Sequence, residues 1–400
     1  MRRSMVAASL LALALGGCGF SGTDGQQQDT ASQQAAAPAP QDNLADSMKS
    51  GDYGFRDSSI PDVADVEARP MMQAQVTLDR LGFGPGVIDG EMGLSTRNAL
   101  RGFQESRGLP QTGELDEATR QALLQGQQFA ATRIVRIPQD WGEKQYTALP
   151  ESPADQAQLE RLGYESLEER LAERFHTTVE VLQALNPGGQ PAGMAGGAQA
   201  APAPAQPPAQ GQPAATGTPA VAFRPGQLVR VPNIGADRIV PGAVKDEEWQ
   251  ATLASLGVGS EQPDAARVVV SKSENTLKAY DADNRLIALF TVSSGSEMDP
   301  LPLGNWEVRG IAFNPDYSYD PRLLRNAPNS GDKQRLPPGP NSPVGVVWID
   351  LSKEHYGIHG TPEPHTIGRA QSNGCVRLTN WDAARLAQMV SQQTKIEFVA

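Results

Sequence analysis

Two long stretches of low sequence complexity divide this chain and exclude one hydrophobic core running through all 400 residues. Residues 19–66 are rich in Gln, Ala, Ser, Asp and Pro, and residues 188–220 are rich in Ala, Pro, Gly and Gln. Such segments bury too little apolar surface to offset the entropy lost on ordering them. They predict flexible connectors, so we expect a multidomain α+β protein and not a single compact fold.

The N-terminus has the pattern of an export signal. Two arginines follow Met1, and a short apolar run from Met5 to Leu15 is too short for a lasting membrane span. The sequence Leu-Gly-Gly-Cys ending at Cys18 resembles the lipobox of bacterial lipoproteins, which implies that residues 1–18 are a signal peptide and that Cys18 carries acyl chains. Gly19 follows, and the resemblance then implies a periplasmic protein anchored by lipid to the outer membrane. The alternative is an ordinary cleaved signal that removes Cys18.

Charge and cysteine content narrow the function further. The net charge of -12 provides no basic surface, which argues against nucleic acid as a partner and against attraction to anionic lipids by charge. The chain has two cysteines, so with Cys18 acylated or removed, Cys375 has no partner for a disulfide within the chain. A single thiol kept in an exported protein suggests a reactive cysteine.

The surroundings of Cys375 are those of a nucleophile. It follows His359 by sixteen residues, and Gly374 precedes it directly. An imidazole that takes the thiol proton produces a reactive thiolate, and His359 is the candidate base. Gly374 has no Cβ, so a substrate carbonyl can approach, and nearby amides can stabilise an oxyanion. A strand is predicted over residues 346–349 and a helix over 381–390, capped by Thr379 or Asn380, so loops between rigid elements carry the pair.

The full string around these two residues resembles the signature of the L,D-transpeptidase (YkuD-like) catalytic domain. In that family, a His-Gly-Thr segment precedes a Ser-His-Gly-Cys-hydrophobic-Arg segment. Asn373 is a departure, because the family more often has a second histidine there, so His359 alone must act as the base. The matching residues are His359, Gly360, Thr361, Gly368, Ser372, Gly374, Cys375, Arg377 and Leu378.

The resemblance implies a peptidoglycan L,D-transpeptidase in cell wall biogenesis. Cys375 would attack the L-centre carbonyl of diaminopimelate in a tetrapeptide stem, release D-Ala, and pass the acyl group to an amine, giving a 3-3 cross-link or a protein attachment. It also implies that no cofactor is needed and that carbapenems acylate the thiol. The implied supporting roles are orientation of His359 by the backbone of Gly360, an oxyanion region shaped by Ser372, Asn373 and Gly374, and a loop or carboxylate contact by Arg377.

Two other functions remain open at this stage. Water in place of the amine would make the protein an L,D-carboxypeptidase or endopeptidase. A degenerate catalytic fold would leave a non-catalytic lipoprotein that tethers the wall, a possibility that only Asn373 favours. The sequence gives no support for a metal site. It has four histidines, of which only His355 and His359 have His-x-x-x-His spacing, and it has no Cys-x-x-Cys cluster. We interpret His355 as a supporting residue.

Residues 67–126 have helical periodicity interrupted by glycine turns. The pattern predicts a helix capped by Thr96 and a last helix containing Thr119 and Leu123. The segment resembles the peptidoglycan-binding domain type 1, a three-helix module, which implies peptidoglycan as the partner. The alternative is a small helical bundle that packs on a neighbour and binds nothing.

Residues 141–233 are predicted to contain two helices, at 167–175 and 178–187, and a closing strand at 224–232. These pieces resemble a LysM glycan-binding module, with the 188–220 segment as a flexible insertion between the second helix and the strand. We expect His176 to be a solvated residue at a helix end.

Residues 265–400 form the predicted catalytic domain. Strand-like runs at 267–270, 276–280 and 286–292 predict a β meander, and residues 303–308 add a strand. The aperiodic segment 314–342 is long enough for a lid, in which Tyr317, Tyr319 and Asn341 are candidates for substrate contact. A decorated surface loop is the equally weighted alternative.

Overall fold

The computed structural model describes residues 60, 63–125, 129–142, 146–194, 222–235, 239–240, 242–323, 332–370, 372 and 374–400. The predicted signal peptide, Cys18, nearly all of the tether, most of the 188–220 insertion and Asn373 lie outside these residues. In the described part of the chain, no helix combines the length and apolarity needed to cross a membrane.

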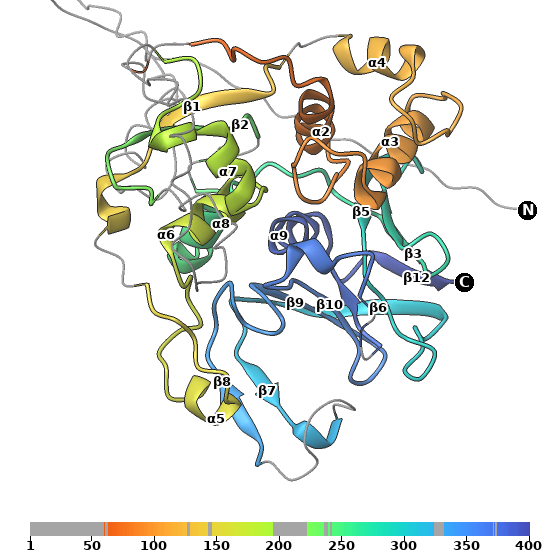
Figure 1. Cartoon of the computed structure of the whole chain (residues 1–400). Helices are drawn as coiled ribbons and strands as arrows, with labels where there is room; N and C mark the ends of the chain where they lie inside the picture. The colour runs from red at the N-terminus through yellow and green to blue at the C-terminus, as the bar shows by residue number, and fades with distance from the viewer. Residues whose placement is uncertain are drawn as a thin grey trace, which may run out of the picture. The chain divides into compact units, whose positions relative to one another are not determined.

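The first module consists of three helices, as expected (Figure 1). Asp116 caps the last of them by accepting a hydrogen bond from the Thr119 amide at 2.8 Å. The middle helix begins after Gly93, so the prediction that Thr96 is a cap was wrong. The Thr96 hydroxyl is buried, where it accepts a hydrogen bond from the Gln75 amide at 3.1 Å. The helices are α2 (Pro70–Arg80), α3 (Leu94–Ser106) and α4 (Glu117–Leu124).

The middle module pairs two helices with a two-stranded antiparallel sheet. Ser166 and Thr178 cap the helices with their hydroxyl groups, which explains where each helix begins. The first strand precedes residue 141 and was missed, because five residues that include two arginines carry a weak strand pattern. The elements are β1 (Thr132–Arg136), α6 (Leu167–Arg174), α7 (Val179–Leu185) and β2 (Leu228–Pro232), with the short α5 (Pro153–Gln156) between β1 and α6.

The third module is built on an eight-stranded sheet of order β11-β10-β9-β6-β12-β3-β4-β5. The predicted meander is present as β3, β4 and β5, which pair antiparallel in sequence order. Two pairs, β10 with β11 and β12 with β3, are parallel. The strands are β3 (Arg267–Ser271), β4 (Thr276–Tyr280), β5 (Leu286–Thr291), β6 (Gly304–Phe313), β9 (Val347–Leu351), β10 (Gly357–His359), β11 (Val376–Arg377) and β12 (Lys395–Val399).

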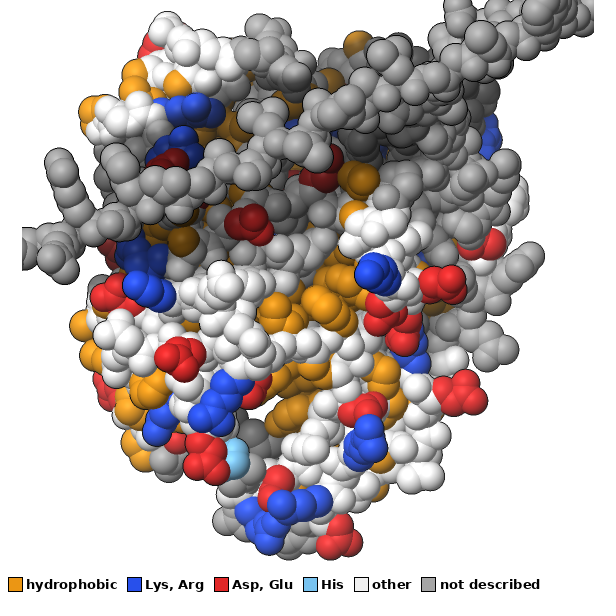
Figure 2. Space-filling model, turned by 180° about the vertical axis from the view of Figure 1, so that it is seen from behind, with side chains coloured by type: hydrophobic (Ala, Val, Ile, Leu, Met, Phe, Trp, Pro, Cys, Tyr) orange, Lys and Arg blue, Asp and Glu red, His pale blue; other side chains and the backbone are white. Residues whose placement is uncertain are grey.

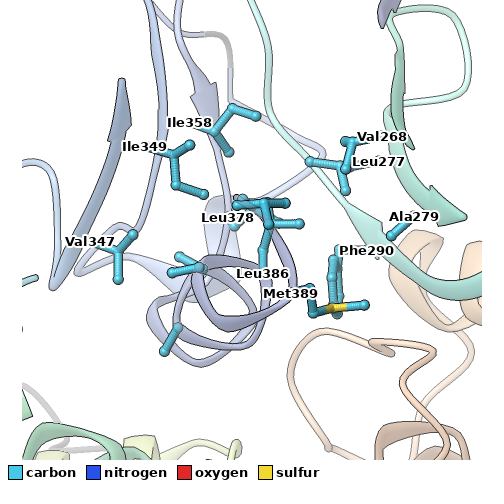
Figure 3. Packing of buried hydrophobic residues seen from close by; sticks show 14 of the residues in the cluster. Val268, Leu277, Ala279, Phe290, Val347, Ile349, Ile358, Leu378, Leu386 and Met389 are labelled. Carbon is cyan, nitrogen blue, oxygen red and sulfur yellow. The ribbon is translucent and has the colours of Figure 1, made fainter. Parts of the chain in front are cut away.

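Helix α9 (Asn380–Met389) lies across this sheet and completes its core. Thr379 caps it, as predicted, by accepting a hydrogen bond from the Asp382 amide at 3.1 Å. Leu386 and Met389 of α9 point toward Phe290 and Ile349 of the sheet (Figure 3). Helix α8 (Glu247–Leu256) adds Trp249 and Leu253 to the same cluster of buried side chains. The lid region carries the short hairpin β7 (Tyr317–Tyr319) and β8 (Gln334–Leu336).

The segment that follows β5 brings the two ends of the sheet together. Ser293 and Arg377 exchange backbone hydrogen bonds of 3.1 and 2.8 Å, and Gly295 forms a bridge with Ser372. Residues 293–296 therefore pair with the chain on either side of Cys375. This closure holds the loop before β11 from both sides.

The chain is a multidomain protein, as expected, and in its described part the three modules also pack directly on one another. The turn after α2 extends the sheet at β5, because Gly84 donates to the Leu289 carbonyl at 2.8 Å and Leu289 donates to Gly82 at 3.2 Å. Leu286 and Leu289 share a core with α2, α3 and α4. Met72 and Val76 of α2 share another core with the middle module. Figure 1 shows α9 between α2 and α7.

His176 lies in the junction between the modules, so the prediction of a solvated residue was wrong. Its ring is fully buried and stacks on Trp381, with centroids 4.7 Å apart. Nδ1 lies 3.0 Å from Asp79, and Nε2 lies 2.8 Å from the Leu256 carbonyl. The prediction failed because the partners come from three distant segments, which local helix periodicity does not reveal.

The surface seen from behind in Figure 2 carries Lys and Arg side chains interspersed with Asp and Glu. Neither sign of charge gathers into a broad patch on the described part of this face.

Candidate active site

His359 ends β10 with its imidazole held in one orientation. The residue is buried, and its ring stacks on Trp348 of β9 with centroids 5.4 Å apart. Nδ1 lies 2.7 Å from the Gly360 carbonyl oxygen. A carbonyl can only accept, so Nδ1 carries the hydrogen and Nε2 is left as the basic nitrogen. The Gly360 carbonyl therefore fixes the tautomer and the direction of the imidazole ring.

The electrostatic surroundings keep this imidazole neutral. Burial lowers the pKa of His359 to about 4, and the nearby Arg377 guanidinium contributes in the same direction. The imidazole is therefore unprotonated at neutral pH, which is the state that a general base requires.

Cys375 lies directly before β11 and is partly exposed. Its Sγ lies 3.9 Å from the His355 carbonyl oxygen. Burial raises the pKa of the thiol, whereas a hydrogen bond from the Gly357 backbone and the charge of Arg377 lower it. The balance leaves the thiol protonated at rest. The site therefore holds a neutral thiol and a neutral imidazole at neutral pH.

Strand register brings the chain next to Cys375 alongside His359. In the parallel β10–β11 pair, Ile358 lies opposite Val376 and His359 opposite Arg377. Ile358 and Val376 are buried in the core below the sheet. Because successive side chains alternate between faces, His359 and Arg377 project from the other face. Cys375 lies directly before β11, so the loop that carries the thiol leads into the strand that pairs with that of His359.

Ser372 and Gly374 build the loop that carries the thiol. The Ser372 hydroxyl donates to the Cys375 carbonyl, and it accepts from the Gly374 amide at 3.2 Å. Gly374 has φ 106, and a Cβ there would lie 2.7 Å from the Tyr356 ring. Glycine is therefore required here because of the backbone conformation and because a side chain would collide with Tyr356. The reason predicted from the sequence was a different one, the approach of a substrate carbonyl. Ser372 acts here on the loop itself.

Arg377 is the cation of the site. The charge of its guanidinium acts on the ionisation of His359, Cys375 and Tyr317. Tyr317 of β7 is close enough for the charges of Cys375 and Arg377 to act on its hydroxyl, while burial raises its pKa. The β7–β8 hairpin therefore reaches the surroundings of Cys375 and Arg377.

Replacing Arg377 by methionine should slow alkylation of Cys375 by iodoacetamide several-fold at pH 7. Removal of the cation disfavours the thiolate, so the rate should rise at a higher pH than in the wild type. The measurement is the rate of peptide modification by mass spectrometry between pH 5 and pH 10. Arg369→Met, at a neighbouring exposed arginine, is the matched control and should keep the wild-type profile. Superimposable profiles for the two variants would contradict this role of Arg377.

Other candidates from the sequence lie away from the reacting groups. The His355 side chain is 75% exposed beside Glu354, and only its backbone reaches Cys375. Asn341 donates its amide to Gly163 and Glu169 at 2.9 and 2.7 Å, so it joins the middle module to the lid region and is not available to a substrate. In the described part of the chain, no group of three or more His, Cys, Asp or Glu side chains is arranged to hold a metal ion.

Several residues that shape the site were missed from the sequence. Trp348 and Tyr356 pack on His359 and Gly374, and Ser293 fixes the loop near Gly368 by accepting its amide at 2.9 Å. The Ser-Ser-Gly-Ser run directly after a predicted strand was the available signal for the last contact, since small polar residues there favour close backbone approach.

Comparison with known proteins agrees with this geometry. Residues 265–398 match the family model described as "L,D-transpeptidase catalytic domain", and residues 69–123 match "Putative peptidoglycan binding domain". "Putative L,D-transpeptidase YkuD" of Bacillus licheniformis is 32% identical over 140 residues, which cover 34% of this chain and 69% of the relative. The Bacillus subtilis protein of the same name is 48% identical over 129 residues, covering 32% and 63%.

A solved structure, "L,D-transpeptidase from Mycobacterium smegmatis", is 21% identical, with a TM-score of 0.28, and covers 34% of this chain and 59% of that chain. In the geometry described above, a β-rich domain carries a histidine at the end of one strand and a cysteine directly before the strand that pairs with it. The sequence relatives then specify the family: this chain belongs to the L,D-transpeptidases and contains the YkuD catalytic domain.

Proposed function

We propose that this protein is a peptidoglycan L,D-transpeptidase that works through a Cys375 acyl-enzyme. The observation that supports this most strongly is that β11, which begins directly after Cys375, pairs with the strand that carries His359, while Nδ1 of His359 is committed to the Gly360 carbonyl. The free Nε2 is then the atom that exchanges protons with the thiol and the leaving group.

The first half-reaction follows from the neutral resting pair. Cys375 Sγ attacks the carbonyl carbon at the L-centre of diaminopimelate in a tetrapeptide stem while His359 Nε2 takes the thiol proton. The oxyanion then collapses, the bond to the nitrogen of D-Ala breaks, and the imidazolium returns its proton to that nitrogen. Cys375 is left as a thioester.

The second half-reaction reverses these roles. An acceptor amine attacks the thioester carbonyl, His359 removes a proton from the attacking nitrogen, and the thiol is regenerated with that proton. The product is a 3-3 cross-link or an attachment to a protein. Arg377 is suited to hold a carboxylate of the stem near the thiol, because its charge is directed at the reacting groups.

The other modules support a substrate in the cell wall. The match of residues 69–123 to a peptidoglycan-binding family favours wall polymer as their ligand. Helices α6 and α7 followed by strand β2 give the order on which the LysM resemblance was based, and we infer that the middle module contributes to glycan binding. We also propose that the protein is exported and anchored by lipid at Cys18, because residues 1–18 have the pattern of a lipoprotein signal peptide.

Incubation with purified tetrapeptide muropeptides tests the proposed reaction. New dimers joined without the terminal D-Ala are expected from the full-length protein, with free D-Ala released in equal amount. Chromatography with mass spectrometry separates this result from simple hydrolysis, which gives tripeptides and no dimers. Release of D-Ala without dimers would replace transfer by L,D-carboxypeptidase activity, and unchanged muropeptides would leave only a wall-binding role.

A further inference from the structure

The backbone that orients His359 is packed against a side chain from α9. A Cβ at Gly360 or at Gly345 would overlap Oδ1 of Asn380. Asn380 is fully buried, so its carboxamide fills the space beside both glycines. Gly360 therefore cannot move toward α9 unless Asn380 moves first. Because the Gly360 carbonyl accepts from Nδ1 of His359, the position of Asn380 affects the orientation of the catalytic imidazole.

Asn380 is itself held from two sides. Its amide donates to Glu173 Oε1 at 2.8 Å and to the Pro340 carbonyl at 3.0 Å. Glu173 belongs to α6 of the middle module, whereas Pro340 lies in the loop between the lid hairpin and β9. An outside module thus supplies one of the two acceptors that fix this carboxamide.

The loop around Pro340 is bonded to the same module. Leu162 donates to the Pro338 carbonyl at 2.9 Å, and Asn341 donates to the Leu162 carbonyl at 3.1 Å. The loop and Glu173 therefore hold Asn380 within one connected set of hydrogen bonds. A displacement of the middle module would disturb both acceptors together.

Glu173 is partly buried where the middle module meets the third module. Loss of hydration raises the pKa of its carboxyl to about 7, against the effect of hydrogen bonds from Tyr164 and Asn380, and the neighbouring Glu169 adds to the rise. Burying a carboxyl group is costly unless its hydrogen bonds are satisfied. The hydrogen bond that Glu173 accepts from Asn380 explains why a carboxyl group lies at this junction.

We propose that Asn380 and Glu173 are positioning residues for His359, so that the middle module sets the geometry of the catalytic base. The proposal rests on the proposed function, in which His359 serves Cys375. It makes the catalytic rate of this chain depend on a residue in a module that carries no reacting group.

Three full-length variants test the role of Glu173. Glu173→Met keeps the volume and removes the acceptor, Glu173→Gln keeps an acceptor oxygen, and Glu180→Met makes a matched change at an exposed site of α7. The probe is the carbapenem imipenem, and the readout is the rate of mass addition at Cys375. We expect about a ten-fold loss for Glu173→Met, a rate within about two-fold of wild type for Glu173→Gln, and no change for Glu180→Met.

A second readout separates positioning from general damage. Alkylation of Cys375 by iodoacetamide at pH 10 does not require the base, so Glu173→Met should be alkylated at the wild-type rate. Asn380→Ala tests the contact from its other end and should slow acylation by imipenem to a similar extent. A wild-type acylation rate in either folded variant, or a loss in Glu173→Gln as large as in Glu173→Met, would overturn the proposal. Failure of the wild-type protein to acquire mass at Cys375 would instead count against the proposed function.

Discussion

The Cys375→Ala variant is expected to lose acylation by a carbapenem completely and to form wall cross-links more than about 1000-fold more slowly than the wild type. The wild-type protein should gain the full mass of the drug, because the thiol opens the β-lactam ring without losing a fragment. The alanine variant has no atom that can form the acyl bond. Intact-protein mass spectrometry and the muropeptide assay measure the two effects.

His359 provides the complementary variant. Glutamine at this position can occupy a similar space, but it cannot accept and return a proton, so His359→Gln should also lose most of the activity. His365→Gln is the matched control, since His365 is exposed and lies in the same segment of the chain. Unchanged muropeptide products from folded Cys375→Ala would show that the thiol is not the nucleophile.

The local sequence singled out His359 and Cys375 from their residue types and spacing, and their catalytic roles stay a prediction. The prediction that both residues lie on loops was wrong for His359, because it ends the short strand β10. A three-residue strand is too short to leave a periodic pattern in the sequence. The sequence could not predict that His359 and Cys375 are both neutral at rest. Their ionisation depends on burial and on how near Arg377 lies to them, which are properties of the folded chain.

The packing of modules was beyond the reach of sequence patterns. Helical periodicity predicted α2 and α9 separately, but nothing local indicates that Asp79 of one meets Arg385 of the other. The same limit explains the errors at His176 and Asn341, whose polar groups are used between modules. Periodicity reports which face of an element is buried and does not identify the partner.

Breaking the buried ion pair between Asp79 and Arg385 should destabilise the protein by about 3–5 kcal/mol at pH 7. The carboxylate and guanidinium lie 2.8 Å apart, and their side chains are 0% and 3% exposed. His176 also contacts Asp79, and Asp382 lies 3.9 Å from Arg385. Arg385→Gln leaves Asp79 buried without its cation, so the free energy of unfolding measured in urea should fall by this amount.

A double-mutant cycle isolates the pair. Asp79→Asn together with Arg385→Gln removes both charges, so no unpaired charge of the pair stays buried. The double variant should therefore be less destabilised than the sum of the single variants. Arg120→Gln is the matched control, because the Arg120–Glu117 pair is 52% and 66% exposed and its loss should change stability by less than about 0.5 kcal/mol. Additive effects of the two buried changes would contradict a coupled pair.

The coupling energy between Asp79 and Arg385 should also decrease in acid. Its pH dependence shows whether the ionisation of Asp79 or that of Asp382 controls it. Burial opposes ionisation of Asp79, but Arg385 and His176 hold its pKa well below the usual range. Its contribution to stability is therefore present above the unfolded pKa of about 3.9 and is lost as the pH falls toward the folded value. Asp382 behaves oppositely, since burial raises its pKa to about 7 and its contribution is lost as the pH rises through that value. The cycle measured at pH 7 and again near pH 2 should show a large coupling energy that shrinks in acid, whereas a coupling that grows in acid would assign it to Asp382.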